Sequence, residues 1–578
     1  MKKIITTILT ALTLTVNSQA VNFLWNNTGT QWTSPTSWTN GVQPTATTAI
    51  GTDVVQFSNF GPNFNTVDLT STRTVQKLEF FSGANTYTFT SGSANPKFLE
   101  ISSGGITNAS SSMQTFNLRV NNSGGNYTWS TAAGGGLTFN QQVGLTTDSS
   151  GTSRTLTLAG DGAYIFNNNL VNNGTSIAPT AKVIYTGNGS ITFNGTNVIG
   201  GATGGGMDIA GGGTVTVNGG TGVGQGVVTL GGASGTANMP ILRINTTNGL
   251  ASTSSLKGST SLATMGTIDL LANNPDAVTT FVMNQYQGNN MNFTNHGVGR
   301  TLLQFTNAAN ILTSSAASGG GRRLFNNSTN LLVQFDGTLD VGGTVSDISV
   351  IGGQGEFIFN GSLLNTGIGV RGLRKEGTGK VTMQAANTYN GDTVVAGGTL
   401  IVNSSLQSPM TTVNNGALLG GSGSLQGVLL NGGTISAGNS AGLLSMNSLN
   451  ASNGNFVFEI GSPTTRGVTY DAIDVTSLLT LGTDTDFTFE VLDNYVFSIG
   501  DSYDLFNFAS IDATNFDITK LDVALPTLSS NELVWDTSSF TTDGMVSVIT
   551  VPEPSLFQMF GLGLISLFVC RRINKRNG

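Results

Sequence analysis

The chain repeats a short pattern in which apolar residues alternate with other residues between a glycine and an asparagine. The pattern is a glycine, a variable residue, an apolar residue, a second variable residue, an apolar residue and an asparagine. It occurs at residues 189–194, 213–218, 355–360 and 398–403, with a shorter form at 136–140. A period of two is typical of a β-strand with one buried face. Glycine and asparagine favour the positive φ angles of tight turns, so we predict many short strands joined by turns.

The spacing of the copies predicts how the strands are arranged. Phe193 and Val217 hold the same position in neighbouring copies and are 24 residues apart. A period in the twenties fits one coil of a parallel β-helix, whereas antiparallel sandwiches place a turn every 8–12 residues. One coil has too few apolar residues for its own core, so stacked coils must share one. We therefore expect an all-β fold, with a right-handed parallel β-helix over residues 61–450. The alternative is two or more separate β-sandwiches.

The polar positions of the pattern and the two ends of the helix add further expectations. Asparagines at the corners of successive coils can stack in ladders in which their amides bond to one another. Charge and aromatic content rise after residue 450, so residues 451–550 are expected to form a C-terminal β region that covers the last edge strand. No long segment between the two ends has a 3.6-residue apolar period, so single helices are expected only at the termini.

Three of the five tryptophans gather near the N-terminus, within residues 21–60. Trp25, Trp32 and Trp38 are interpreted as a hydrophobic cap on the first coil. The alternative is an aromatic platform for glycan contact, because flat rings stack on the apolar faces of sugars.

The composition excludes several classes of function. Only 9% of the residues are charged, against about 25% in ordinary globular chains. The formal net charge is −8, which argues against nucleic acid as a partner. The single cysteine, Cys570, and the single histidine, His296, leave little material for disulfides, zinc sites or histidine-dependent catalysis. His296 is expected to be solvated in a polar turn, and we expect no metal and no cofactor.

Catalytic carboxylates are sparse. A polysaccharide lyase or glycosidase built on a β-helix would need paired carboxylates, or basic residues with calcium ligands, on one face. The candidates are Asp484 and Asp486 on one predicted strand, Asp471 and Asp474 nearby, and Asp161 in a turn. We expect all of them to be solvated strand and turn residues, and we predict that the protein is not an enzyme. The alternative is a secreted polysaccharide-active β-helix enzyme.

The N-terminus has the features of a signal peptide over residues 1–20. Lys2 and Lys3 precede a largely apolar run at residues 4–16, and small residues follow up to Ala20. A basic segment, a short apolar segment and a small-residue site are what signal peptidase recognises, with cleavage expected after Ala20.

The C-terminus has three parts in a fixed order. Pro552, Glu553 and Pro554 precede the apolar residues 555–570, and a basic cluster follows at 571–576. This tail resembles the PEP-CTERM sorting signal. The resemblance implies that an exosortase-type peptidase of a Gram-negative-type cell envelope recognises the three motif residues and removes the tail. It also implies a transmembrane segment at 555–570 in the precursor. A plain C-terminal anchor is the alternative.

Residues 373–403 carry a second, independent motif. They contain Leu-Arg-Lys-Glu-Gly-Thr-Gly, then Asn-Thr-Tyr-Asn-Gly, then Gly-Thr-Leu-Ile-Val. This segment resembles the autotransporter-associated β-strand repeat, which implies about one coil of a passenger-type β-helix. Autotransporters end in a membrane barrel, whereas this tail is a helix-length apolar run, so we expect the tail to direct sorting.

The expected function is that of an exported cell-envelope or extracellular-matrix structural or adhesion protein, with exopolysaccharide as a candidate partner.

Overall fold

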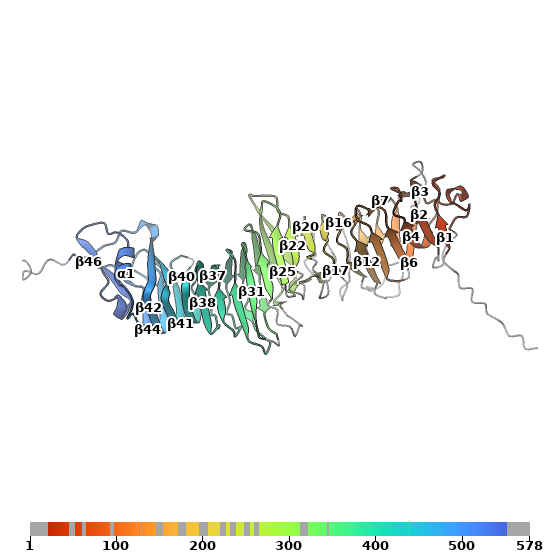
Figure 1. The fold of residues 1–578 in the computed structure, drawn as a ribbon. Helices are drawn as coiled ribbons and strands as arrows, with labels where there is room; N and C mark the ends of the chain where they lie inside the picture. Colours follow the sequence, from red (N-terminus) through yellow and green to blue (C-terminus); the bar gives the residue numbers. More distant parts are fainter. Residues whose placement is uncertain are drawn as a thin grey trace, which may run out of the picture. The chain divides into compact units, whose positions relative to one another are not determined.

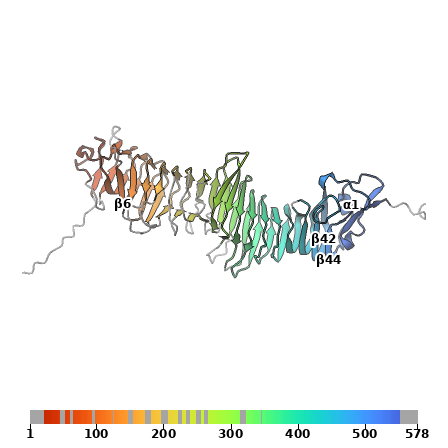
Figure 2. The ribbon, with the colours of Figure 1, turned by 180° about the vertical axis from the view of Figure 1, so that it is seen from behind.

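The computed structural model describes residues 21–44, 53–59, 65–92, 97–123, 125–145, 154–171, 181–195, 206–219, 227–231, 239–247, 255–258, 265–288, 290–312, 322–343, 346–438 and 440–551. The chain divides into two compact units, Met1–Gly343 and Thr344–Gly578. Both are built almost entirely from parallel β-strands, as the alternating pattern predicts (Figure 1; Figure 2 shows the reverse side).

The first unit contains two sheets of parallel strands. One sheet holds β1 (Asn22–Leu24), β2 (Val54–Phe57), β4 (Arg73–Phe80), β6 (Phe98–Asn108), β8 (Arg119–Asn122), β9 (Tyr127–Thr131), β11 (Val143–Gly144), β12 (Arg154–Gly160), β14 (Leu170–Val171), β15 (Ala181–Tyr185), β17 (Gly206–Ile209), β19 (Val227–Leu230), β21 (Ser255–Lys257), β24 (Gln285–Gln287), β27 (Ala309–Ile311) and β30 (Thr338–Asp340). The other holds β3 (Thr66–Asp68), β5 (Thr88–Thr90), β7 (Met113–Phe116), β10 (Gly136–Phe139), β13 (Ala163–Phe166), β16 (Ser190–Phe193), β18 (Thr214–Val217), β20 (Ile241–Ile244), β22 (Gly266–Leu270), β23 (Val278–Met283), β25 (Asn290–Asn295), β26 (Arg300–Phe305), β28 (Arg323–Asn326) and β29 (Leu331–Phe335). A 3₁₀ turn, η1 (Pro35–Ser37), lies near the N-terminus.

The register of the strands confirms the predicted stacking of coils. Strands β16 and β18 pair in parallel, with Phe193 opposite Val217, so the two copies of the pattern are adjacent rungs. Both side chains are buried, as are the matching positions of the neighbouring strands. The chain therefore advances one rung for each copy of the pattern, and the separate sandwiches considered above do not form.

A column of phenylalanine rings runs through the core of the first unit. Phe89, Phe116, Phe139, Phe166 and Phe193 come from successive strands, and neighbouring ring centroids are 4.7, 5.0, 5.2 and 5.2 Å apart with nearly parallel planes. These separations follow the ~4.8 Å spacing of hydrogen-bonded strands. Each ring removes a large apolar surface from water and contacts the ring of the next coil, so no coil depends on its own residues alone.

A ladder of asparagine side chains runs along the outside of the same strands, as predicted. The Nδ2 amide of each residue after the first donates to Oδ1 of the residue one coil earlier, over distances of 2.6–2.8 Å. The ladder consists of Asn117, Asn140, Asn167, Asn194, Asn218 and Asn245. Asn140, Asn194 and Asn218 are the final asparagines of three copies of the sequence pattern, so the ladder explains the residue type at the end of those copies.

The second unit is also built from parallel strands, and three strands near its end are much longer, with 14, 18 and 20 residues. It contains β31 (Asp347–Gly353), β32 (Glu356–Phe359), β33 (Leu363–Leu364), β34 (Arg371–Lys375), β35 (Lys380–Met383), β36 (Thr393–Val395), β37 (Gly398–Val402), β38 (Met410–Asn414), β39 (Ala417–Gly421), β40 (Ser424–Ala437), β41 (Leu443–Ile460), β42 (Ala472–Val491) and β44 (Phe506–Asp512). The predicted division at residue 450 was wrong. Parallel pairing crosses it, with Leu449 opposite Leu479 and Phe456 opposite Phe487, and it ends only at β44. Apolar residues continue to alternate with other residues through β41. The additional charged and aromatic residues after residue 450 therefore change the surface of the unit but not the parallel pairing of its strands.

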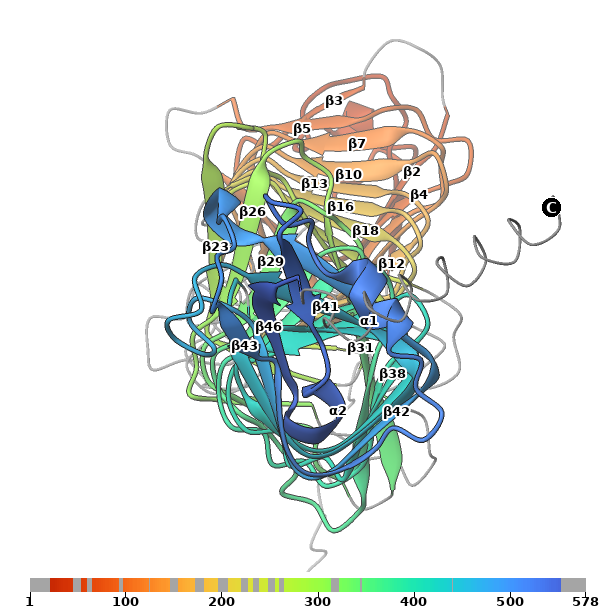
Figure 3. The same cartoon turned by 90° about the vertical axis from the view of Figure 1, so that its left-hand side faces the viewer.

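A small cap follows the last parallel strands. It consists of η2 (Leu492–Asn494), α1 (Thr519–Ala524), α2 (Phe540–Asp543) and an antiparallel sheet of β43 (Ser502–Asp504), β45 (Leu533–Asp536) and β46 (Met545–Thr550). Figure 3 shows α1, α2 and β46 lying across the end of the stack. Phe540 of α2 packs edge-on against Phe487 of β42 and Phe506 of β44, at 5.6 and 5.9 Å. We name residues 492–551, apart from β44, the C-terminal cap.

The two ends of the chain lie outside the described residues. These include the expected signal peptide and the expected terminal helices. In the part of the chain that the structure describes, no helix is long and apolar enough to cross a membrane. The right-handed sense of the coils stays a prediction from the sequence.

Candidate functional site

The residues expected to direct processing are not among those described. Ala20, at the expected signal-peptide cleavage site, and Pro552, Glu553 and Pro554 of the expected sorting motif all lie in the two undescribed terminal segments. Their roles stay predictions.

The tryptophans near the N-terminus do not form an exposed platform. Trp25, Trp32 and Trp38 are 0, 0 and 2% exposed, and their rings meet edge to face at 5.0–5.1 Å. The indole of Trp38 donates to the carbonyl of Trp32 at 2.8 Å. The glycan-contact interpretation of these three residues was therefore wrong, because no ring face is open to a sugar. Their burial agrees with the interpretation made first from the sequence, a hydrophobic cap on the first coil.

The aspartates considered as catalytic candidates make separate, mostly structural contacts. Asp486 is exposed and pairs with Lys520 at 2.9 Å, and the exposed Asp484 lies on the same strand. Asp474 pairs with Arg466 at 2.6 Å. Asp161 accepts a hydrogen bond from the side chain of Asn188 one coil later, at 3.1 Å.

Asp471 departs from the expectation of a solvated residue. Its side chain is 0% exposed, and its two oxygens accept backbone N–H groups of Gly442 and Glu459, both at 2.8 Å. Burial raises its pKa to about 7, and the nearby carboxylates of Glu459 and Glu490 act in the same direction, against the two hydrogen bonds. Asp471 thus joins the turn before β41 to the end of that strand.

The single histidine also differs from the expectation. His296 is partly exposed, and its Nδ1 lies 3.0 Å from Oδ1 of Asp269, which is only 6% exposed. Asp269 also accepts from Arg243 at 2.9 Å and from Thr294 at 3.0 Å. The sequence could not show this cluster, because its members belong to three successive coils.

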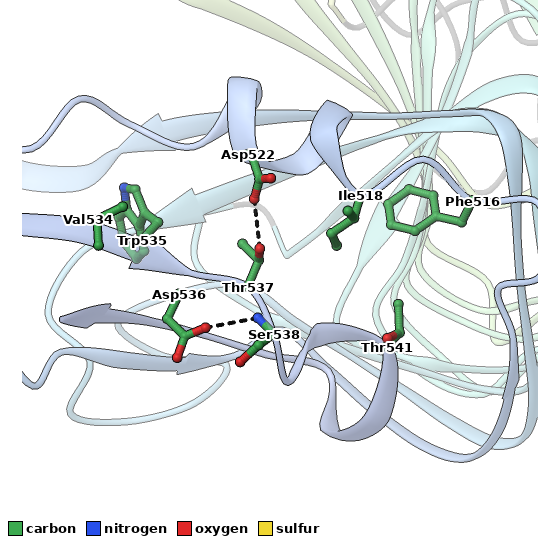
Figure 4. A pocket seen from close by; sticks show the side chains of 9 residues that line it. All are labelled: Phe516, Ile518, Asp522, Val534, Trp535, Asp536, Thr537, Ser538 and Thr541. Carbon is green, nitrogen blue, oxygen red and sulfur yellow. Dashed lines mark hydrogen bonds between the residues drawn. The ribbon is translucent and has the colours of Figure 1, made fainter. Parts of the chain in front are cut away.

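The C-terminal cap contains an open cleft of about 800 Å³ (Figure 4). Its apolar lining comes from the segment before α1 and from β45, and consists of Phe516, Ile518, Val534 and Trp535. Its polar lining comes from α1, from the end of β45, from the segment between β45 and α2, and from α2 itself, and consists of Asp522, Asp536, Thr537, Ser538 and Thr541. Sequence analysis missed this cleft, because no local pattern marks residues that meet only when the cap folds.

Hydrogen bonds within the cap fix the polar side chains of the cleft. Thr537 Oγ1 donates to Oδ1 of Asp522 at 2.7 Å, and the backbone N–H of Ser538 donates to Oδ1 of Asp536 at 3.0 Å. Hydrogen bonds from Ser538 lower the pKa of Asp536. Asp536 is therefore ionised at neutral pH and presents a carboxylate to the cleft.

Strands β34 to β37 form two successive rungs of the second unit. Leu373 lies opposite Thr393, and Val381 lies opposite Leu400. The ammonium group of Lys375, which is 1% exposed, donates to the carbonyls of Glu376, Gly377 and Gly397 at 2.9–3.0 Å. Burial lowers its pKa to about 8.

Residues 373–402 match the family model of the passenger-associated transport repeat. This confirms the repeat expected in this segment. No curated protein and no solved structure matched the chain in the corresponding searches.

The structure explains the residue pattern of the passenger-associated transport repeat. Gly377 and Gly398 have φ angles of 72° and 63°, which glycine adopts without strain. A Cβ at Gly398 would lie 2.5 Å from the carbonyl oxygens of Gly377 and Gly379 and 2.8 Å from Lys375 Nζ, so a residue with a side chain does not fit there. The hydroxyl of the buried Tyr389 bonds to Thr393 at 2.7 Å and fixes the turn between the rungs.

Proposed function

We propose that the protein is an exported component of the cell surface or extracellular matrix, with a structural or adhesive role and no catalytic activity. The observation that carries this proposal is the passenger-associated transport repeat at residues 373–402, which is part of a continuous parallel stack from β34 to β44. Stacked coils give a long surface for their mass, which suits contact with large partners. Few charges lie along the chain, so an uncharged exopolysaccharide is the partner we favour.

The proposed export route uses both ends of the chain. Signal peptidase would cleave after Ala20, and an exosortase-type peptidase would recognise Pro552, Glu553 and Pro554. The apolar residues 555–570 would hold the precursor in the membrane until the tail is removed. This part of the proposal rests on the order and spacing of the sequence motifs.

Two measurements on cells that make the protein test the route. Protease added to intact cells should degrade it, and the intact mass should correspond to an N-terminus at Val21 and a C-terminus near Pro554. The variant Glu553→Gln should retain the tail through Gly578, whereas the control Ser555→Ala should be processed normally. A cytoplasmic protein that retains Met1 would contradict export.

A substrate screen tests the absence of catalysis. The purified protein should release no products from pectin, alginate or neutral glycans, and deletion of its gene should alter biofilm or cell-surface properties. Turnover that a single Asp→Asn change abolishes would contradict this part of the proposal and favour a polysaccharide-active enzyme.

A further inference from the structure

The cleft in the C-terminal cap is lined by the aromatic ring of Trp535 and by a set of polar side chains, which we name the polar wall. Two contacts fix the position of the Trp535 ring. Its Nε1–H donates to the carbonyl of Pro526 at 2.8 Å, and the ring packs edge-on against Phe497 at 5.2 Å. Of the five tryptophans, all of which are described, the other four are at most 2% exposed, whereas Trp535 is partly exposed and lines the cleft. A ring held in this way can bind a flat apolar face without losing further side-chain freedom.

The polar wall presents groups that accept hydrogen bonds. Asp522 accepts from Thr537, and Asp536 accepts from the backbone and side chain of Ser538. A carboxylate has about four lone-pair sites, so each of the two aspartates has further capacity to accept from a ligand. Hydroxyl groups of Thr537, Ser538 and Thr541 lie along the same wall. Carboxylates that accept from hydroxyl groups make stronger hydrogen bonds than neutral acceptors do.

The charged residues that line the cleft indicate a ligand without negative charge. No lysine, arginine or histidine is among its described lining residues, and the nearby Lys520 is bound to Asp486 and to the carbonyl of Thr483. Two carboxylates without a cation repel uronates and sulfated sugars. A neutral sugar has an apolar ring face for Trp535 and hydroxyl donors for the aspartates. The volume of about 800 Å³ lies within the usual range of small-ligand sites.

We propose that this cleft binds a neutral sugar unit of a glycan. The inference rests on the proposed surface function and gives it one specific contact point, in the C-terminal cap.

Quenching of tryptophan fluorescence tests the proposal in the chain that spans residues 21–551. Acrylamide should reach Trp535 far more readily than the four buried tryptophans. Cellotriose, laminaritriose or mannotriose at millimolar concentration should protect Trp535 from quenching, whereas trigalacturonate should not. The protection should saturate with ligand concentration.

Variants separate binding from folding. Trp535→Ala should weaken binding of the active trisaccharide about 10-fold, as measured by calorimetry. Asp536→Asn, which keeps the shape of the side chain, should also weaken binding, by a few fold. Val523→Ala is the matched control, because this side chain on α1 is 86% exposed and does not line the cleft.

The proposal is overturned if the folded protein binds none of the neutral trisaccharides, if trigalacturonate binds more tightly, or if Asp536→Asn leaves affinity unchanged. The proposed surface function would survive any of these results, because protease accessibility and processing are measured independently of sugar binding.

Discussion

Asp471 is a buried acid whose surroundings favour the protonated form. Desolvation raises its pKa to about 7, while its two backbone hydrogen bonds only partly offset that effect. An unfolded chain would titrate this group near 3.9. Between these values the folded state binds the proton more tightly, so stability is greatest below about pH 4, falls as pH rises to about 7, and is constant above.

We therefore predict that the second unit becomes less stable from pH 4 to pH 7, by on the order of 2–4 kcal/mol from Asp471 alone. Urea unfolding followed by emission of Trp535, which lies in this unit, measures the effect. Asp471→Asn removes the titrating group and should flatten the dependence, while it lowers stability at every pH because the amide can accept only one of the two backbone N–H groups. Asp474→Asn should retain the dependence. An unchanged pH profile in Asp471→Asn would show that another group is responsible.

The order of residues along the chain does not show whether their side chains point to the solvent or to the core. Trp25, Trp32 and Trp38 form the same local pattern whether their rings point to solvent or to the core, so the sequence left both interpretations open. Trp535 has no aromatic neighbour in the local sequence, yet it lines the cleft, because the segments that follow η2 and α1 contact it through Phe497 and Pro526.

At the scale of strands, the sequence was most informative where its alternation was regular. Residues 189–194 and 213–218 gave the strands β16 and β18, their register and the asparagine ladder. The sequence did not show where the C-terminal region begins, because β41 keeps the same alternation on both sides of residue 450. The capping elements α1 and α2 have only 6 and 4 residues, too few for a helical period to appear.

The ladder itself can be tested at its centre. Asn194→Asp should destabilise the first unit by about 1–2 kcal/mol at pH 7, because a carboxylate cannot donate to Oδ1 of Asn167. At pH 3 the protonated acid regains a donor, so part of the loss should disappear. Urea unfolding followed by emission of the buried Trp129 measures both effects.

The exposed Asn531 in the cap is the matched site for this experiment, because it lies outside the ladder. Asn531→Asp should leave the unfolding of the first unit unchanged at both pH values. Equal effects of the two substitutions would mean that charge alone, and not the loss of a ladder hydrogen bond, caused the change.

At the scale of the whole molecule, a stack of parallel strands must end somewhere without attracting another chain. Strand β44 is the last parallel strand of the stack, and Phe540 of α2 covers the rings of Phe487 and Phe506 beside it. Unpaired backbone groups and uncovered aromatic rings at such an end would favour association between molecules.

We predict that a chain ending at Asp512 self-associates, whereas one ending at Val551 does not. The shorter chain loses α1, β45, α2 and β46, which exposes the aromatic rings and leaves β43 without its partner strand. Light scattering after size-exclusion chromatography would measure the difference. A shorter chain that stays monomeric, with an unchanged circular dichroism spectrum, would show that the last strands do not need the C-terminal cap to prevent association.

The hydrogen bonds of the asparagine ladder all run in one direction, which gives the array a polarity along the chain. Each amide donates to the residue one turn nearer the N-terminus, from Asn140 to Asn245. During N-to-C assembly of these coils, the newest folded coil therefore offers an asparagine Oδ1 that is not yet bonded, and the incoming coil supplies the N–H. Such vectorial growth would suit the proposed export, because each coil between Asn140 and Asn245 would fold onto the coil before it.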